Sequence, residues 1–213
     1  TEGNFKNYSI RENDPFSLSG NAVNTLFADR NNRLWVGTDA GLNLLLPEGN
    51  FKRYKKDFDD DNSLSDNTVL SIVEDHDGNL WIGTRDGLNK FNPVLEIFSR
   101  YYADFPTKDL LGSSIINALM VDSKGEIWVG TPAGINQLYR SKTEEPDALS
   151  GSFSFGELPN SYATTLMSDK SGLIWIGTLS AGIATLNNEA QQFFSRRFSQ
   201  SKGYVPERNK SYC

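Results

Sequence analysis

Cysteine and histidine are almost missing from this chain. Its 213 residues include one cysteine, Cys213, which is the last residue, and one histidine, His76. A single cysteine excludes an internal disulfide, which fits both a cytosolic and a periplasmic protein. A lone histidine without a neighbouring cysteine offers neither the usual zinc ligands nor the parts of a histidine-based catalytic triad. The sequence therefore predicts no metal site and no cofactor.

Long apolar runs and an excess of positive charge are also missing. No run is long enough to span a bilayer, and no signal peptide opens the chain. The 21 Lys and Arg residues against 27 Asp and Glu residues give a net charge of −6. A phosphate backbone would be repelled on average, so nucleic acid is not an expected partner. With 38% hydrophobic residues the chain can still bury a sizeable core.

The chain does contain a fixed repeat. Its only four tryptophans are separated by 46, 47 and 47 residues, at Trp35, Trp81, Trp128 and Trp175. An aspartate stands six residues before each tryptophan, at Asp29, Asp75, Asp122 and Asp169, and Gly-Thr follows shortly after it. A fixed period in this range is typical of repeat architectures.

Each copy contains the same succession of strands and turns. An apolar run before the aspartate predicts a strand buried on both faces, and the Asp and Gly residues after it predict a tight turn. The tryptophan lies in a second strand, and a short Gly-containing hairpin leads to a third. The fourth copy has one extra residue in this hairpin (LSAG), which predicts a longer turn and leaves its register open. Spaced aromatics mark an outer strand, with Phe153 and Phe155 as candidates in the third copy.

Four antiparallel strands per copy predict an all-β protein built from β-propeller blades, over residues 1–200. Residues 3–8 (GNFKNY) nearly repeat residues 49–54 (GNFKRY), which predicts a leading outer strand from a further blade. Three arrangements stay open: part of a larger propeller, an arc that is open or completed by another chain, and a closed four-bladed ring. An open arc would expose apolar blade faces and favour self-association. Residues 201–213 are a tail or the entry to another blade.

The recurring aspartates are expected to serve the scaffold, because one per blade spaces them too far apart for a catalytic pair. Residues 75–79 (DHDGN) share two positions with a calcium loop but lack the remaining ligands, so we expect a structural turn. The charged run over residues 52–61 is expected to be a solvated loop.

A binding site is expected where the copies differ. The hairpins between second and third strands vary, and they open on the same face as the linkers between blades. We expect Arg85 and Asp86, with Asp39 in the first copy, to bind hydroxyls or a carboxylate. Tyr102 and Phe105 could offer a flat apolar surface to a sugar ring. The alternative is that these are unconstrained surface turns.

The repeated pattern, seen best in residues 67–89 (NTVLSIVEDHDGNLWIGTRDGLN), closely resembles the two-component regulator propeller repeat. The resemblance covers four units and implies part of the periplasmic sensor region of a bacterial membrane histidine kinase. Many such proteins are hybrid sensors that detect oligosaccharides released from polysaccharides. In that family the ligand contacts lie outside the repeat motif, so the resemblance assigns no binding residue here.

The expected function is therefore non-catalytic, extracytoplasmic ligand recognition, with an oligosaccharide as the partner and the membrane reached only through other parts of the receptor. Two alternatives remain. One is a propeller enzyme, either similar to quinone-dependent dehydrogenases or glycan-cleaving, which would need a polar cluster that breaks the repeat. The other is a purely structural interaction scaffold.

Overall fold

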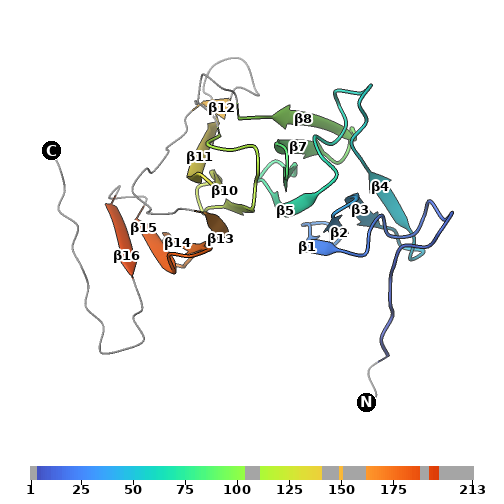
Figure 1. Cartoon of the computed structure of the whole chain (residues 1–213), viewed down its shortest axis with the longest axis horizontal. Helices are drawn as coiled ribbons and strands as arrows, with labels where there is room; N and C mark the ends of the chain where they lie inside the picture. The colour runs from blue at the N-terminus through green and yellow to red at the C-terminus, as the bar shows by residue number, and fades with distance from the viewer. Residues whose placement is uncertain (1–3, 104–110, 141–148, 151–161, 188–191, 197–213) are drawn as a thin grey trace. The chain divides into compact units, whose positions relative to one another are not determined.

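The computed structural model describes residues 4–103, 111–140, 149–150, 162–187 and 192–196 (Figure 1). Across these residues there is no helix, and thus none long and apolar enough to cross a membrane. The chain divides into two compact units, residues 1–101 and residues 102–213. Each unit contains two four-stranded antiparallel sheets, whose strands follow one another in sequence order. The prediction of all-β, four-stranded blades is confirmed.

The first unit holds the first two blades. The first blade consists of β1 (Val23–Ala28), β2 (Leu34–Thr38), β3 (Gly41–Leu45) and β4 (Phe51–Tyr54). The second consists of β5 (Val69–Glu74), β6 (Leu80–Thr84), β7 (Leu88–Asn92) and β8 (Ile97–Tyr101).

The second unit holds the third and fourth blades. The third consists of β9 (Ala118–Val121), β10 (Ile127–Thr131), β11 (Gly134–Arg140) and β12 (Leu149–Ser150). The fourth consists of β13 (Ala163–Ser168), β14 (Leu173–Thr178), β15 (Ile183–Asn187) and β16 (Gln192–Arg196). The outer strand of the third blade is thus Leu149–Ser150, whereas Phe153, Phe155 and the tail 201–213 lie outside the described residues.

The extra residue of the fourth copy is absorbed in its hairpin. Trp35 pairs with Leu44 in the first blade, and Trp175 pairs with Thr185, the matching residue, in the fourth. The fourth hairpin closes through a bond from the Thr178 amide to the Gly182 carbonyl, 3.0 Å long and one residue wider than in the second blade. The predicted longer turn is confirmed, and the open question about register is answered because the strands keep the common pairing.

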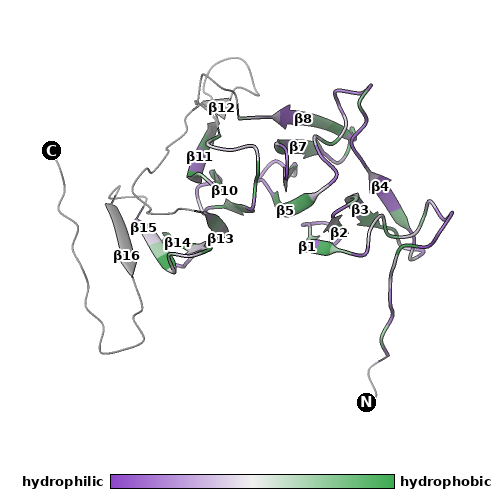
Figure 2. Ribbon diagram, viewed as in Figure 1, coloured by the Kyte–Doolittle hydropathy of each residue, from purple (hydrophilic) through white to green (hydrophobic). Residues whose placement is uncertain are grey.

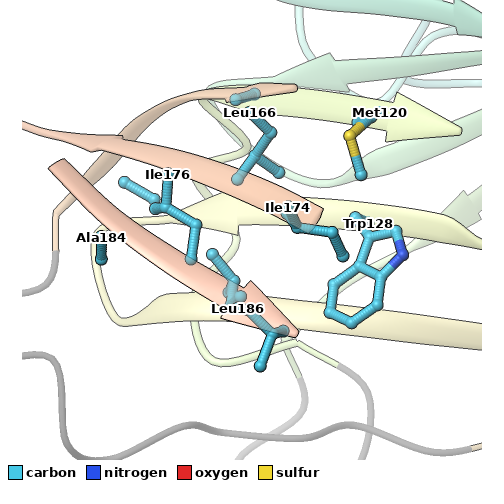
Figure 3. Packing of buried hydrophobic residues seen from close by; sticks show 10 residues of the cluster. Met120, Trp128, Leu166, Ile174, Ile176, Ala184 and Leu186 are labelled. Atoms are coloured by element: carbon cyan, nitrogen blue, oxygen red, sulfur yellow. The ribbon is translucent and has the colours of Figure 1, made fainter. Parts of the chain in front are cut away.

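The two blades of each unit pack face to face through the tryptophan side of one sheet. In the first unit, the buried Trp35 lies in a cluster with Leu80, Ile82 and Phe91 of the second blade. In the second unit, Figure 3 shows Trp128 pointing toward Ile174 of the fourth blade. Burying a large apolar side chain in this way stabilises the fold by about 1.5–3 kcal/mol. In these two pairs of blades, the indoles of Trp35 and Trp128 therefore fill the space between neighbouring sheets.

Gly37, in the Gly-Thr pair after Trp35, lets adjacent blades approach closely. A Cβ atom placed on it would lie 2.6 Å from Thr25 Cγ2 and 2.6 Å from Val69 Cγ1 of the next blade. In the third blade, a Cβ on Gly130 would lie 3.2 Å from Ala118 and 3.2 Å from Ala163. A glycine at this point allows the inner strands of two blades to meet.

The prediction that every inner strand is buried on both faces is wrong for the first blade and for the fourth, where Met167 of β13 is 57% exposed. Val23 and Leu26 of β1 are 45% and 64% exposed, whereas the matching Val69 and Ile72 of β5 are 0% and 6% exposed. The difference arises because the first blade covers that side of β5, and no described blade covers that side of β1. The apolar pattern is the same in both strands, but only one of them has a neighbour.

Candidate functional site: the hairpin face of the blades

Each blade is fixed at its first turn by the repeated aspartate. One carboxylate oxygen, Oδ1, accepts bonds of 2.8–3.1 Å from the backbone amides two and four residues later. The other oxygen accepts the tryptophan indole N–H at 2.9–3.0 Å in all four blades. The aspartates therefore act as turn and side-chain anchors.

The anchoring also changes the acidity of these carboxyl groups. Burial raises the pKa of Asp29, but hydrogen bonds from Trp35 and Arg33 outweigh burial and hold that pKa below its usual value. In the fourth blade, bonds from the Ser171 hydroxyl and the Trp175 indole lower the pKa of Asp169 to about 2. Both groups are therefore carboxylates at neutral pH and suited to accepting hydrogen bonds.

At the opposite end of each blade, the repeated threonine fixes the hairpin between the second and third strands. The hydroxyl of Thr84 donates to the Gly87 carbonyl at 2.7 Å and accepts the Asp86 amide at 3.2 Å. Equivalent bonds of 2.9–3.2 Å occur at Thr38, Thr131 and Thr178. Gly87 itself has a φ of 110°, a backbone conformation that disfavours other residues. These bonds therefore hold the residues just before and after each hairpin tip in a fixed conformation, which we call the rigid base of the hairpin.

A buried polar network connects this base to the linker that enters the blade. In the first blade the hydroxyls of Ser19 and Thr38 are 2.9 Å apart, and Asn43 Oδ1 accepts the Ser19 amide at 2.9 Å. Ser65, Thr84 and Asn89 repeat both contacts in the second blade, at 3.0 and 2.9 Å. The hairpin and the linker lie side by side, as predicted for this face.

An arginine on each outer strand of the first unit holds the linker loop. Arg53 Nε and Nη2 donate to the carbonyls of Ser17 and Asp14 at 2.7 and 2.8 Å. Arg100 donates in the same way to the carbonyls of Ser63 and Asp60 at 2.7 and 2.6 Å. This role of the two arginines was not predicted from the sequence. The signals were an Arg-Tyr pair shared by the outer strands (FKRY and FSRY) and the tripeptide SLS shared by the two linkers.

The prediction of a solvated loop over residues 52–61 is only partly right, because residues 52–54 belong to β4. Residues 57–61 are exposed, as expected of a solvated loop, and the linker becomes buried only after this run, at Ser63, Leu64 and Ser65. The Ser63 hydroxyl accepts the Asp57 amide at 2.7 Å, which closes the loop on itself. The hairpin face is thus bordered by a loop of fixed conformation.

The predicted site residues are found on this rigid base. Asp39, Arg85 and Asp86 are exposed on the hairpin tips. The backbone amides of Asp39 and Arg85 donate to the carbonyls of Ala22 and Thr68, both at 3.1 Å, at the entry to the inner strand. The structure brings Arg85 and Asp86 together in one tip, whereas Asp39 lies on the neighbouring blade. These positions can present a guanidinium and carboxylates to a polar ligand.

The predicted aromatic surface is only partly described. Tyr102 is 37% exposed at the start of the second unit, and Phe105 lies outside the described residues. A different aromatic escaped the sequence reasoning: Tyr162, 36% exposed, accepts the Leu179 amide through its carbonyl at 3.0 Å. Leu179 is the fourth hairpin tip and is 68% exposed. Tyr162 and Leu179 are therefore joined through their main chains on the hairpin face of the fourth blade, and both side chains are exposed.

The calcium-like segment is a structural turn. Asp75 binds the Asp77 and Asn79 amides, and the exposed His76 offers its carbonyl to Arg30 Nη1 of the first blade at 3.0 Å. Within the described ranges no group of three or more His, Cys, Asp or Glu side chains is placed to hold a metal ion.

A shallow groove of about 630 Å³ lies elsewhere, beside β4. Its lining combines apolar and basic side chains: Pro15, Phe16, Leu46, Phe51, Lys52, Arg53 and Lys55. None of the predicted site residues contributes to it. Two of the cations have partners already, since Arg53 holds the linker and Lys52 pairs with Glu96 at 2.5 Å.

Four segments of the chain, residues 17–40, 63–86, 109–133 and 157–180, match the family model for the two component regulator propeller. The chain carries two-component regulator propeller repeats. Each matched segment contains the aspartate anchor and ends at the hairpin tip. No protein with a curated description matches the chain in sequence.

Solved structures give the same architecture. The chain is similar to the extracellular domain of a protein assigned as a hybrid two component system from B. thetaiotaomicron, with 25% identity and a TM-score of 0.70. This match covers 90% of the chain and 24% of that structure, so these repeats span about a quarter of its length. A second such domain from B. thetaiotaomicron is 22% identical, with a TM-score of 0.64, over 91% of the chain and 26% of that structure. A catalytically inactive virginiamycin B lyase from Staphylococcus aureus, 14% identical over 83% of the chain and 56% of the lyase, has a TM-score of 0.61 and shows the fold alone.

Proposed function

We propose that these repeats form part of the non-catalytic, extracytoplasmic sensor region of a two-component signalling receptor and that their ligand is an oligosaccharide. The observation that carries the proposal is the contrast within each blade. Every blade has the same anchors, whereas the exposed hairpin tips differ, from Asp39 and the Arg85–Asp86 pair to Leu179 beside Tyr162. Variable groups on a rigid base are the usual arrangement for recognition.

The chemistry of the tips fits a sugar. Carboxylates and a guanidinium bind hydroxyl groups, and an exposed aromatic ring can stack on the apolar face of a pyranose. The likeness to extracellular domains assigned to hybrid two component systems supports the sensor role, a periplasmic location and an inner-membrane histidine kinase as the rest of the receptor. Ligand binding would then bias the relative placement of the sensor parts, which the receptor passes across the membrane.

Calorimetric titration of the extracellular region that carries these four blades tests the proposal. Neutral and acidic oligosaccharides are titrated, and product formation is followed by chromatography in the same samples. We expect saturable heat without product, and weaker binding in the Arg85→Ala variant. Lys124→Ala is the control, because Lys124 is an exposed cation in the aspartate turn, at the end of a blade opposite the hairpin. Product would indicate an enzyme, and no heat with any oligosaccharide would favour a structural scaffold.

A further inference from the structure

The third blade breaks the repeat at the base of its hairpin tip. In the other three blades the first tip residue donates its backbone amide to the carbonyl at the entry of the inner strand: Asp39 to Ala22 and Arg85 to Thr68, both at 3.1 Å, and Leu179 to Tyr162 at 3.0 Å. The third blade has Pro132 at the tip position and Ile115 at the entry. Proline has no amide hydrogen, so this bond cannot form in the third blade.

The carbonyl of Ile115 is therefore left without its usual donor. Among the residues that the structure describes, no other group donates to it, although the Ile115 amide donates to the Ser113 hydroxyl at 3.1 Å. A backbone carbonyl is a strong acceptor with two lone pairs. Ile115 and Pro132 are both only half-buried, so a donor from solution can reach this place.

A second exception to the repeat lies in the linker of the same blade. Gly112 stands where the first two blades have Ser19 and Ser65, which are 3% and 0% exposed. The Gly112 amide still donates to Asn136 Oδ1, at 3.4 Å, but glycine has no hydroxyl to pair with Thr131, and Gly112 is exposed. The linker therefore covers the base of this hairpin less completely than in the first two blades.

An exposed aromatic residue occupies the same repeat position in the next blade. Tyr162, one repeat after Ile115, is 36% exposed. The inner strands β9 and β13, which these two residues shortly precede, pack against each other. Asn117 joins the two strands, because its Nδ2 donates to the Ala163 carbonyl at 3.0 Å. Ile115 and Tyr162 therefore lie at the same end of two neighbouring inner strands.

The groups that a ligand can reach at this end are uncharged. The inner strands are mostly hydrophobic, as Figure 2 shows for β5, so polar contacts are made mainly at strand entries and hairpin tips. The tips of the second unit are Pro132–Ala133 and Leu179–Ser180, which carry no charge. A carbonyl oxygen accepts a hydrogen bond from a hydroxyl group but repels a carboxylate or a sulfate. This end of the second unit therefore favours a neutral sugar unit.

We propose that the third and fourth blades hold a subsite for an uncharged sugar unit of the ligand. The Ile115 carbonyl accepts one of its hydroxyl groups, and the Tyr162 ring stacks on its apolar face. Pro132 keeps the carbonyl available, because an amide at this position would occupy it. The inference rests on the proposed function, since it takes the ligand to be an oligosaccharide, and it adds which kind of sugar unit the second unit binds.

Restoring the missing amide tests this subsite. In the extracellular region that carries these blades, Pro132→Ala supplies a donor to the Ile115 carbonyl without adding bulk. Calorimetry measures binding of the hexasaccharides of cellulose, xylan, arabinan and polygalacturonic acid. We expect a neutral hexasaccharide to bind, and Pro132→Ala to bind it about five- to ten-fold more weakly, as one lost hydrogen bond implies. Pro47→Ala is the matched control and should bind normally, because Pro47 is an exposed proline between β3 and β4, away from the hairpin tips.

Hydrogen exchange at position 132 gives a readout that does not depend on the ligand. In the Pro132→Ala protein the new amide should exchange as slowly as the Arg85 amide, at least about ten-fold slower than an unprotected amide. Fast exchange would overturn the proposal, because it would show that the Ile115 carbonyl is not placed to accept a donor. Tyr162→Ala should weaken binding of the same hexasaccharide about five-fold, and Tyr162→Phe, which keeps the ring, should not.

The outcomes separate this inference from the proposed function. No binding of any of the four hexasaccharides to the unaltered protein would refute the proposed function, and this inference with it. Binding of the acidic hexasaccharide alone, or unchanged affinity in Pro132→Ala, would overturn only the neutral subsite. If Pro132→Ala does not fold, as judged by circular dichroism, the two Tyr162 variants decide, and equal affinity in both variants and the unaltered protein would overturn the proposal.

Discussion

Replacing Asp29 by Asn should weaken the first blade through one identifiable set of bonds. Asp29 accepts the amides of Asn31 and Arg33 and the indole of Trp35, each at 2.9 Å. Asparagine has a single side-chain acceptor oxygen, so in either orientation its NH₂ group faces an N–H donor. Because Trp35 is 1% exposed, water cannot replace the lost acceptor. A buried hydrogen bond to a charged group contributes about 1.5–3 kcal/mol, and we expect a loss of this size.

A double-mutant cycle of Asp29→Ala with Trp35→Phe isolates the indole bond from the volume lost with the indole, because alanine removes both acceptor oxygens whereas asparagine can keep the one that faces Trp35. The free energy of unfolding of the four proteins is measured by urea denaturation, followed by far-UV circular dichroism. We expect a coupling energy of about 1.5–3 kcal/mol. Asp39→Asn, an exposed aspartate of the same blade, is the control and should change stability by less than about 0.5 kcal/mol. A coupling energy below about 0.5 kcal/mol would refute the reasoning, because it would mean that the bond adds nothing to the packing of Trp35.

Three further predictions follow from the contacts of the first unit. Gly37→Ala should lower the free energy of unfolding by about 1–3 kcal/mol, because the new methyl would overlap Val69 of the next blade; an unchanged urea midpoint would contradict this. The Lys52 ammonium bound to Glu96 holds the pKa of that carboxyl below its ordinary value of 4.5. Stability from this pair is therefore complete above pH 4.5 and should fall as pH drops through the lowered pKa, and Lys52→Met should flatten that part of a pH series of urea titrations. Arg100→Ala should free the linker loop, because it removes the bonds to the loop carbonyls. We expect faster hydrogen exchange in residues 57–63 and unchanged exchange in β6, and equal exchange in both proteins would show that Arg100 does not hold the loop.

The candidate site was predictable as a location but not as a set of contacts. Asp39 and Arg85 were identifiable because they break a repeat at a hairpin whose place in the blade follows from strand order. The contact between Arg100 and the linker was not predictable, because its acceptors are the carbonyls of Ser63 and Asp60, about 40 residues earlier. Every residue type has a backbone carbonyl, so no residue pattern marks these acceptors. Tyr162 was missed for a similar reason: it is joined to Leu179 by a backbone bond between the residues just outside β13 and β14.

The sequence by itself determined the blade. The aspartate anchor, the glycine-containing turns and the threonine base all join residues within about one turn of each other, so local spacing is enough to specify them. Only the tertiary structure decided which apolar faces are buried. Leu26 and Ile72 occupy the same position in the same pattern, yet one is 64% and the other 6% exposed. Burial depends on whether another sheet lies against the strand, and the pattern within a strand carries no information about its neighbour.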